Sequence, residues 1–171
     1  MKKAVVVVFG MLLFASCQKE MKTGFIDNTQ LIKEYQKRKD LEASVKTKIE
    51  AFDKRADSIG KVFQAQAAVL QQNDPQLAKK ESQDKYQQLG QQYQAFQQQM
   101  QREEQLIQAE SQTQIDTLLK EIRSFVKDYG KKNGYTYILG SNEAGSVMYG
   151  DENKELTKEI LEELNKAYKK D

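Results

Sequence analysis

The sequence predicts a mostly α-helical protein in which a long antiparallel helical hairpin, a coiled-coil arm, is inserted into a small head of strands and one helix. Two stretches, 29–72 and 76–130, carry apolar residues at steps of three and four, the spacing of one helix face. They meet at Asn73-Asp74-Pro75, which holds the single proline. The chain is polar overall, with a mean hydropathy of −0.78, so these thin stripes are its main apolar surface. A hairpin of this length is too elongated for an ordinary globular enzyme.

The composition argues against several kinds of site. The 171 residues fit one domain, and they include no histidine, no tryptophan and one cysteine. The chain therefore lacks the residues that most zinc sites, histidine-based triads and disulfides require. The remaining Lys, Asp, Glu and Tyr side chains stand in no recognisable catalytic pattern. We expect no enzyme, no cofactor and no metal site.

The first 16 residues have the pattern of an export signal. Lys2 and Lys3 precede an apolar run from Ala4 to Phe14 that is too short to span a bilayer. Small residues then precede Cys17, as in a bacterial lipobox, although Phe14 stands where leucine is usual. We predict a signal peptide at 1–16 and a tether at 17–22 that carries lipid on Cys17. The alternative is an ordinary secretory signal with Cys17 as a bystander thiol.

The predicted location is the periplasm, with the lipid holding the protein to the outer membrane. The sequence leaves open which face of that membrane carries the anchor. Processing would remove Lys2 and Lys3, so that 27 basic residues become 25, equal to the 25 acidic ones. A side-chain charge of zero predicts no strong attraction to nucleic acid. The basic residues on the helix faces are mixed with acidic ones, which also argues against a nucleic-acid partner.

The mature chain begins with a predicted strand at 23–27, and Asn28 or Thr29 can cap the helix that follows. From residue 41 the apolar positions of this helix share one face, and charges fill the others. The face contains Leu41, Val45, Ile49, Phe52, Ala56, Ile59, Phe63, Ala67 and Leu70.

The turn and the second helix follow from Asp74 and Pro75, which have the pattern of an N-cap and a first helical proline. The stripe of the second helix runs from Leu77 to Tyr129. At 1.5 Å per residue the helices would be about 65 and 80 Å long, so they must lie against each other as an antiparallel coiled coil. Gly60 and Gly90 are equidistant from Pro75, so they would lie level with each other on the two paired helices. They predict a point of flexibility about halfway along the arm, with chance placement of the two glycines as the alternative.

After Tyr129 the pattern changes. Glycines and lysines at 130–134 end the helix. The aromatic and β-branched segment 135–139 predicts a strand, and 146–149 predicts a second strand that forms a hairpin with it. Apolar spacing predicts a short helix over 155–169. The segments 23–28 and 131–171 would therefore form the head, with 29–130 as the arm and its turn at 73–75.

This order of elements resembles the Skp (OmpH-like) family of periplasmic chaperones. The matching segments are 24–29, 135–139, 147–151 and 156–161, with a hairpin of similar length between them. Gln18-Lys19-Glu20 further resembles the export tags of surface lipoproteins in the Bacteroidetes. The resemblance implies a homotrimer whose heads share a β-body. Three arms would enclose a cavity that takes in unfolded outer-membrane β-barrel proteins without ATP.

The resemblance and the apolar pattern together suggest the functional residues. The candidate contacts between heads are Phe25, Ile26, Tyr137, Ile138 and Val147. The candidate client contacts are Tyr86, Tyr93 and Phe96, for which a place in the seam between the helices is the alternative. Family arms are basic near their tips, whereas the charges of 71–94 in this chain sum to zero.

Two functions fit the sequence. The first is an ATP-independent holdase that keeps outer-membrane proteins from aggregating. The second is a structural lipoprotein, a coiled-coil spacer or stalk that binds no client. The sequence does not identify clients, and the trimer comes from the resemblance alone.

Overall fold

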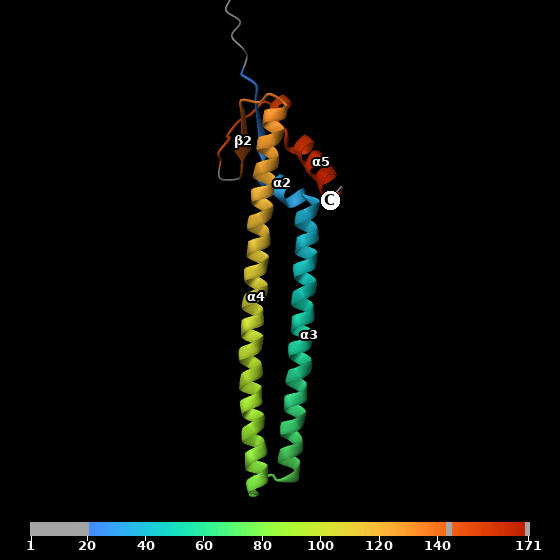
Figure 1. Ribbon diagram of the computed structural model, residues 1–171, viewed down its shortest axis with the longest axis vertical. Coiled ribbons are helices and arrows are strands. Elements are labelled where there is room, and N and C mark those ends of the chain that lie inside the picture. The colour runs from blue at the N-terminus through green and yellow to red at the C-terminus, as the bar shows by residue number, and fades with distance from the viewer. Residues whose placement is uncertain (1–20, 143–144, 170–171) are drawn as a thin grey trace, which may run out of the picture.

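The computed structural model describes residues 21–142 and 145–169, and its shape is a long arm that extends from a small head (Figure 1). The arm consists of α3 (Gln36–Asn73) and α4 (Lys80–Lys132), which lie side by side. Their 38 and 53 residues give lengths of about 57 and 80 Å. The head contains β1 (Thr23–Asp27), α2 (Asn28–Glu34), β2 (Tyr137–Ser141), the 3-10 helix η2 (Glu152–Lys154) and α5 (Thr157–Tyr168). The predicted fold class is confirmed.

The strands of the head form a parallel pair, with Thr23 opposite Tyr137 and Asp27 opposite Ser141. On its other side, β1 makes a bridge from Phe25 to Glu155. β1 therefore has a partner on both sides, whereas the outer edge of β2 has none within the described residues. The whole arm is the connection between these two parallel strands.

The predicted β-hairpin is wrong. Residues 146–149 form no strand within the described part of the chain, and β2 begins at Tyr137 instead of Tyr135. Tyr135 lies beyond the end of α4 but is tied to it, because its N–H donates to the carbonyl of Gly130 at 2.9 Å and its ring stacks on Tyr129 at 6.1 Å. β2 pairs with the distant β1, and its other edge has no partner among the described residues, so the β propensity of 146–149 is not used within the protomer.

The hydrophobic core lies entirely in the head and the adjoining end of α4. Its buried residues are Ile26, Leu31, Tyr35, Leu118, Ile122, Leu156, Ile160 and Leu164. α3 contributes no buried residue. The free energy that hydrophobic burial contributes to folding is therefore concentrated in the head.

The seam of the arm is only half-buried. The predicted stripe on α3 faces α4 at Leu41, Val45, Phe52, Ala56, Ile59, Phe63, Ala67 and Leu70. Ile49, predicted for the same face, is 44% exposed and lies at its edge. Two helices cannot cover each other's apolar faces as fully as a globular core does, so the arm keeps apolar surface in contact with solvent.

The predicted continuous helix over 29–72 is interrupted at Tyr35, whose ψ of 125° is extended. No glycine or proline causes the break, so its cause lies in contacts from α5. Tyr35 is buried and packs edge-on against Tyr168 at 6.1 Å. The N–H of Gln36 lies at the start of α3 and has no acceptor within that helix. It donates to Oδ1 of Asn165 at 2.9 Å. These distant contacts outweigh the local preference for one helix.

The N-cap of α2 is Asp27, not Asn28 or Thr29 as predicted. Its carboxylate accepts a hydrogen bond from the N–H of Gln30 at 2.9 Å. The N–H of Asp27 itself donates to Oγ1 of Thr157 at 2.8 Å, which ties this cap to the start of α5.

The turn at the arm tip also differs from the prediction. Pro75 is not the first residue of a helix, because Asp74 is the C-cap of α3 and α4 starts only at Lys80. The Asp74 carboxylate accepts hydrogen bonds from the N–H groups of Ala78 at 3.0 Å and Lys79 at 2.9 Å. Leu77 has a positive φ of 51°, a conformation that a non-glycine residue adopts only where its surroundings hold it. The Asp74 side chain therefore bridges the end of α3 and the residues just before α4.

Asp74 makes the tip sensitive to pH. The hydrogen bonds from the backbone of Lys79 and Ala78 lower the pKa of its carboxyl group. The stabilisation is thus complete above the ordinary aspartate pKa and is lost as the pH falls through the lowered folded value. We expect Asp74→Asn to speed hydrogen exchange at Ala78 and Lys79 at neutral pH, relative to intrinsic rates, with head amides unchanged. Unchanged exchange at the tip would contradict this role.

Candidate functional site

The arm is divided by its charges. Three ion pairs join α3 to α4: Lys37–Glu121, Lys48–Glu110 at 2.6 Å, and Arg55–Glu103. All three lie between the head and residue 55 of α3. Beyond Arg55 no ion pair joins the two helices among the described residues. We call this outer part, residues 56–73 and 80–102, the distal half of the arm.

Aromatic contacts replace ion pairs in the distal half. The ring of Phe63 on α3 lies 5.3 Å from that of Tyr93 and 5.8 Å from that of Phe96 on α4. Of the candidate client contacts, Phe96 is half-buried in this seam, whereas Tyr93 and Tyr86 remain 40% and 42% exposed. The structure thus places Phe96 between the helices and leaves the two tyrosines accessible.

Gly60 and Gly90 are not level, contrary to the prediction. Phe63 faces Tyr93, and Gly90 borders the same groove as Ala67, so the two glycines are offset by about two helical turns. The reversal extends past Pro75 to Lys79, and this moves the midpoint of the hairpin. A Cβ added to either glycine would meet nothing within 4 Å. Local flexibility at each glycine stays a prediction.

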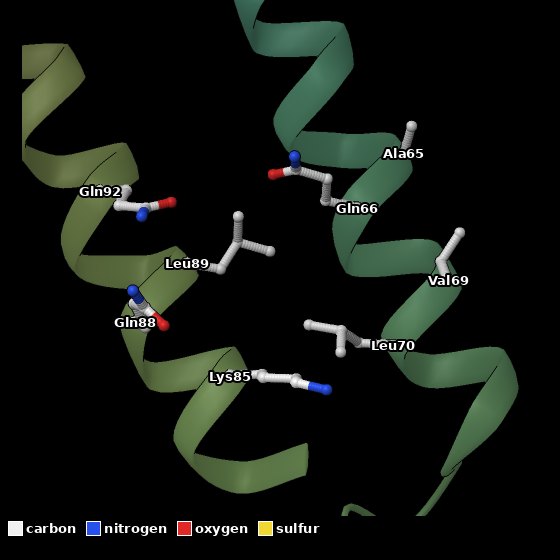
Figure 2. Close-up of a pocket in the computed structure, with 8 residues that line it drawn as sticks. All are labelled: Ala65, Gln66, Val69, Leu70, Lys85, Gln88, Leu89 and Gln92. Atoms are coloured by element: carbon white, nitrogen blue, oxygen red, sulfur yellow. The ribbon is translucent and has the colours of Figure 1, made fainter. Parts of the chain in front are cut away.

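Two shallow grooves flank the seam of the distal half. The first, which we call the Gln groove, has a volume of about 460 Å³ (Figure 2). Its lining residues are Ala65, Gln66, Val69, Leu70, Lys85, Gln88, Leu89 and Gln92. In Figure 2, Leu70 and Leu89 point toward each other between the helices, and glutamine side chains surround them. The groove is therefore apolar along its floor and carries amides at its rim.

The second groove, which we call the Tyr groove, has a volume of about 270 Å³. It is lined by Phe63, Gln64, Ala67, Tyr86, Leu89, Gly90 and Tyr93. Leu89 belongs to both grooves. At about 100° per residue, the other residues of the two linings project to opposite sides of the seam. Each arm therefore offers an apolar groove on both of its faces.

The grooves nearer the head are different, because charged side chains line them. One contains Arg38, Glu42, Lys46 and Glu50, and another contains Lys48, Arg55, Glu103 and Glu110. Several of these residues pair with one another, as Arg55 does with Glu103. The Tyr groove has no charged residue in its lining, and the Gln groove has only Lys85, which pairs with Glu81 at 2.6 Å.

The head exposes large apolar side chains on β2 and on the segment that follows it. Tyr137, a candidate contact between heads, is 58% exposed. Sequence reasoning missed three further residues: Leu139 at 51%, Met148 at 90% and Tyr149 at 88%. Leu139 shares a face with Tyr137 because side chains of a strand alternate, and this period could have identified it.

The other candidate contacts are less exposed. Phe25, Ile138 and Val147 are half-buried. Gly150 lies so close to Phe25 that an added Cβ would come within 2.3 Å of the ring. Ile26 is 4% exposed and belongs to the core of the protomer, so its assignment to an interface is wrong. A side chain that its own protomer buries cannot contact a second copy.

The family described as "Outer membrane protein (OmpH-like)" matches residues 22–164 of this chain. The chain belongs to the OmpH-like family. The resemblance to Skp-type proteins is thereby confirmed, over a range that includes both strands of the head and the entire arm. Among curated proteins, none matches the sequence.

One solved OmpH-like structure has the same fold. It is the crystal structure, at 2.83 Å resolution, of a candidate outer membrane chaperone (OmpH-like) from Caulobacter crescentus CB15. The TM-score is 0.74 at 14% sequence identity, over 86% of this chain and 85% of that one. At this identity the similarity establishes the fold, and the side chains that line the grooves belong to this chain.

The predicted membrane anchor of this OmpH-like chain lies outside the described residues, because Cys17 precedes residue 21. The family match begins at residue 22 and does not test it. Within 21–142 and 145–169, no helix combines the length and apolar character needed to cross a bilayer.

Proposed function

We propose that this OmpH-like chain is an ATP-independent holdase, which binds unfolded outer-membrane β-barrel proteins and prevents their aggregation during transit. The observation that carries the proposal is the apolar surface of the distal half. Val69, Tyr86 and Tyr93 are each at least 40% exposed there, on a rod with no core of its own to bury them. Exposed apolar surface of this kind marks a place where another chain binds. The solved Caulobacter relative, crystallised as a candidate chaperone, supports the same role.

The proposed assembly is a homotrimer joined through the heads. The free edge of β2 and the exposed Tyr137, Leu139, Met148 and Tyr149 support an interface at this surface. An unpaired strand edge with apolar neighbours is stabilised when another copy covers it. Three arms that project from such a body would enclose a space for a client. The segment 146–149, which has the composition of a strand, would gain a pairing partner in the assembly.

We further propose export to the periplasm and attachment to the outer membrane through lipid on Cys17. The support is the lipobox-like pattern before this residue. Mass spectrometry of the N-terminal peptide from isolated membranes tests it. A peptide that begins at Cys17 and carries acyl chains is expected, and an unmodified Cys17 thiol would contradict the anchor.

The test of the holdase is suppression of aggregation. A β-barrel membrane protein in urea is diluted into buffer with the mature chain, residues 17–171, and turbidity is followed. We expect turbidity to fall sharply near one trimer per client. The competing function, a coiled-coil spacer or stalk, predicts turbidity equal to that without the protein.

Leu139→Asp is expected to break the assembly without unfolding the protomer. The substitution places a charge at the proposed interface, where it would be desolvated without a partner. Native mass spectrometry should show monomers, with helical content by circular dichroism unchanged. Leu106→Asp is the matched control, because Leu106 is 69% exposed but lies on the arm. A trimer that survives Leu139→Asp would exclude this face as the interface.

A further inference from the structure

The neutral lining of the two distal grooves has a consequence for what they can bind. A charged side chain that enters either groove would lose water and gain no opposite charge, which is unfavourable. Lys85 does not change this, because Glu81 already pairs with it. The grooves near the head, by contrast, are lined by paired acids and bases. The distal grooves therefore select uncharged groups.

The glutamines at the rim add a second kind of recognition. Gln66, Gln88 and Gln92 make no side-chain hydrogen bond within the part of the chain that the structure describes. Each amide offers two N–H donors and one carbonyl acceptor. An extended polypeptide carries unpaired backbone N–H and C=O groups along its length. The rim can thus bind the backbone of an extended segment, whatever its sequence.

We propose that the Gln groove and the Tyr groove are binding sites for extended, uncharged segments of unfolded protein that present aromatic or aliphatic side chains. The apolar floor at Leu70 and Leu89 takes the side chains, and the glutamine amides pair with the backbone. The inference rests on the proposed holdase function and locates its binding surface within a single arm. Since the grooves open on opposite faces of the hairpin, a client can also bind on the side of an arm that faces away from a central cavity.

Gly90 allows a test that preserves the fold. Gly90 lines the Tyr groove, and nothing lies within 4 Å of an added Cβ, so Gly90→Leu fills the groove without a clash. Gly60→Leu is the matched control, because Gly60 is equally open, lies within a helix and lines neither distal groove. Both substitutions raise helix propensity by the same amount. Only Gly90→Leu is expected to impair binding.

The Gln groove has a matched pair of its own. Val69→Glu places a charge in its lining, whereas Val62→Glu places the same charge outside both grooves. The two valines are 54% and 52% exposed, so the substitutions disturb the helix to a similar degree. Val69→Glu should weaken binding, and Val62→Glu should leave it unchanged.

The probe is a capped, fluorescein-labelled peptide of alternating phenylalanine and serine, and binding to the mature protein is measured by anisotropy. We expect Gly90→Leu and Val69→Glu each to weaken binding about tenfold, with both controls close to wild type. A peptide with aspartate in place of phenylalanine should not bind. Wild-type affinity in both groove variants, or equal binding of the aspartate peptide, would overturn the proposal.

Two further outcomes separate this inference from its premises. If the protein suppresses aggregation but all four variants bind the peptide as the wild type does, the holdase function is supported and the grooves are not its binding sites. If the grooves bind the peptide but the protein does not suppress aggregation, the grooves bind extended segments and the holdase function is wrong. If Gly90→Leu changes the sedimentation of the protein alone, the Tyr groove binds a second arm, and the assignment to clients is wrong.

Discussion

Replacing Leu118 with aspartate is expected to unfold the head. Leu118 is 2% exposed and lies where α4 enters the core formed by the head helices. A carboxylate at this position would be buried without an opposite charge, and the leucine contacts would be lost. We expect a loss of about 4 kcal/mol or more in the free energy of unfolding. Urea denaturation followed by tyrosine fluorescence measures it.

The control for this prediction is Leu106→Asp on the same helix. Leu106 is 69% exposed, so its replacement should change the free energy of unfolding by less than about 0.5 kcal/mol. If the two variants were equally stable, the core would not lie where the structure places it. If both unfolded, the arm would contribute far more to stability than its half-buried seam indicates.

Removal of the distal half of the arm is expected to abolish holdase activity and to leave the head intact. The variant lacks residues 57–101 and joins the helices through a short Asn-Gly linker. Every core residue lies outside this range, as does the exposed head surface. The variant should keep the oligomeric state of the wild type and its resistance to urea. Turbidity of the diluted β-barrel protein should equal that without chaperone.

A shorter deletion near the head distinguishes loss of the binding surface from loss of length. This variant lacks one heptad from each helix, residues 42–48 and 110–116, in the part of the arm where Lys48 pairs with Glu110. Removal of seven residues turns a helix face by only about 20°, so the seam remains aligned. We expect this variant to retain most activity. Equal loss in both variants would mean that arm length, and not the distal surface, determines client protection.

The helical hairpin could be predicted because its signals are local. The spacing of apolar residues along each helix shows the helical period. Asp74 and Pro75 mark the reversal, although Asp74 is the C-cap of α3 and not the N-cap of the second helix. The predicted seam faces the correct partner from Leu41 to Leu70. These features depend on residues within one or two turns of each other, which a sequence shows directly.

The errors come from contacts between distant segments. The break at Tyr35 depends on Asn165 and Tyr168, which lie far along the chain, and no residue at the break indicates it. The burial of Ile26 depends on α5, which lies far along the chain and contacts β1. Apolar character predicted that Ile26 would be covered, but only the tertiary structure shows that its own protomer covers it.

The candidate site was partly predictable for a related reason. The aromatic residues of the distal half are visible in the sequence, and Tyr86 and Tyr93 do remain accessible. The grooves depend on which residues of α3 lie opposite which residues of α4. The reversal sets this register, and a shift of a few residues at the tip, as occurred at Pro75, displaces every pairing along the arm. The sequence could therefore suggest client-contact residues but not the grooves that they line.

The parallel pairing of β1 with β2 makes the order of folding a consequence of the topology. The two strands lie at opposite ends of a very long loop, and closing such a loop as a random chain is entropically unfavourable and slow. The arm removes most of this barrier, since α3 and α4 can zip together from the turn through contacts between near neighbours in sequence. By the time zipping reaches Lys37 and Glu121, the segments that become β1 and β2 have been brought together. We therefore expect the head to assemble last, after the paired helices have brought its two strands together.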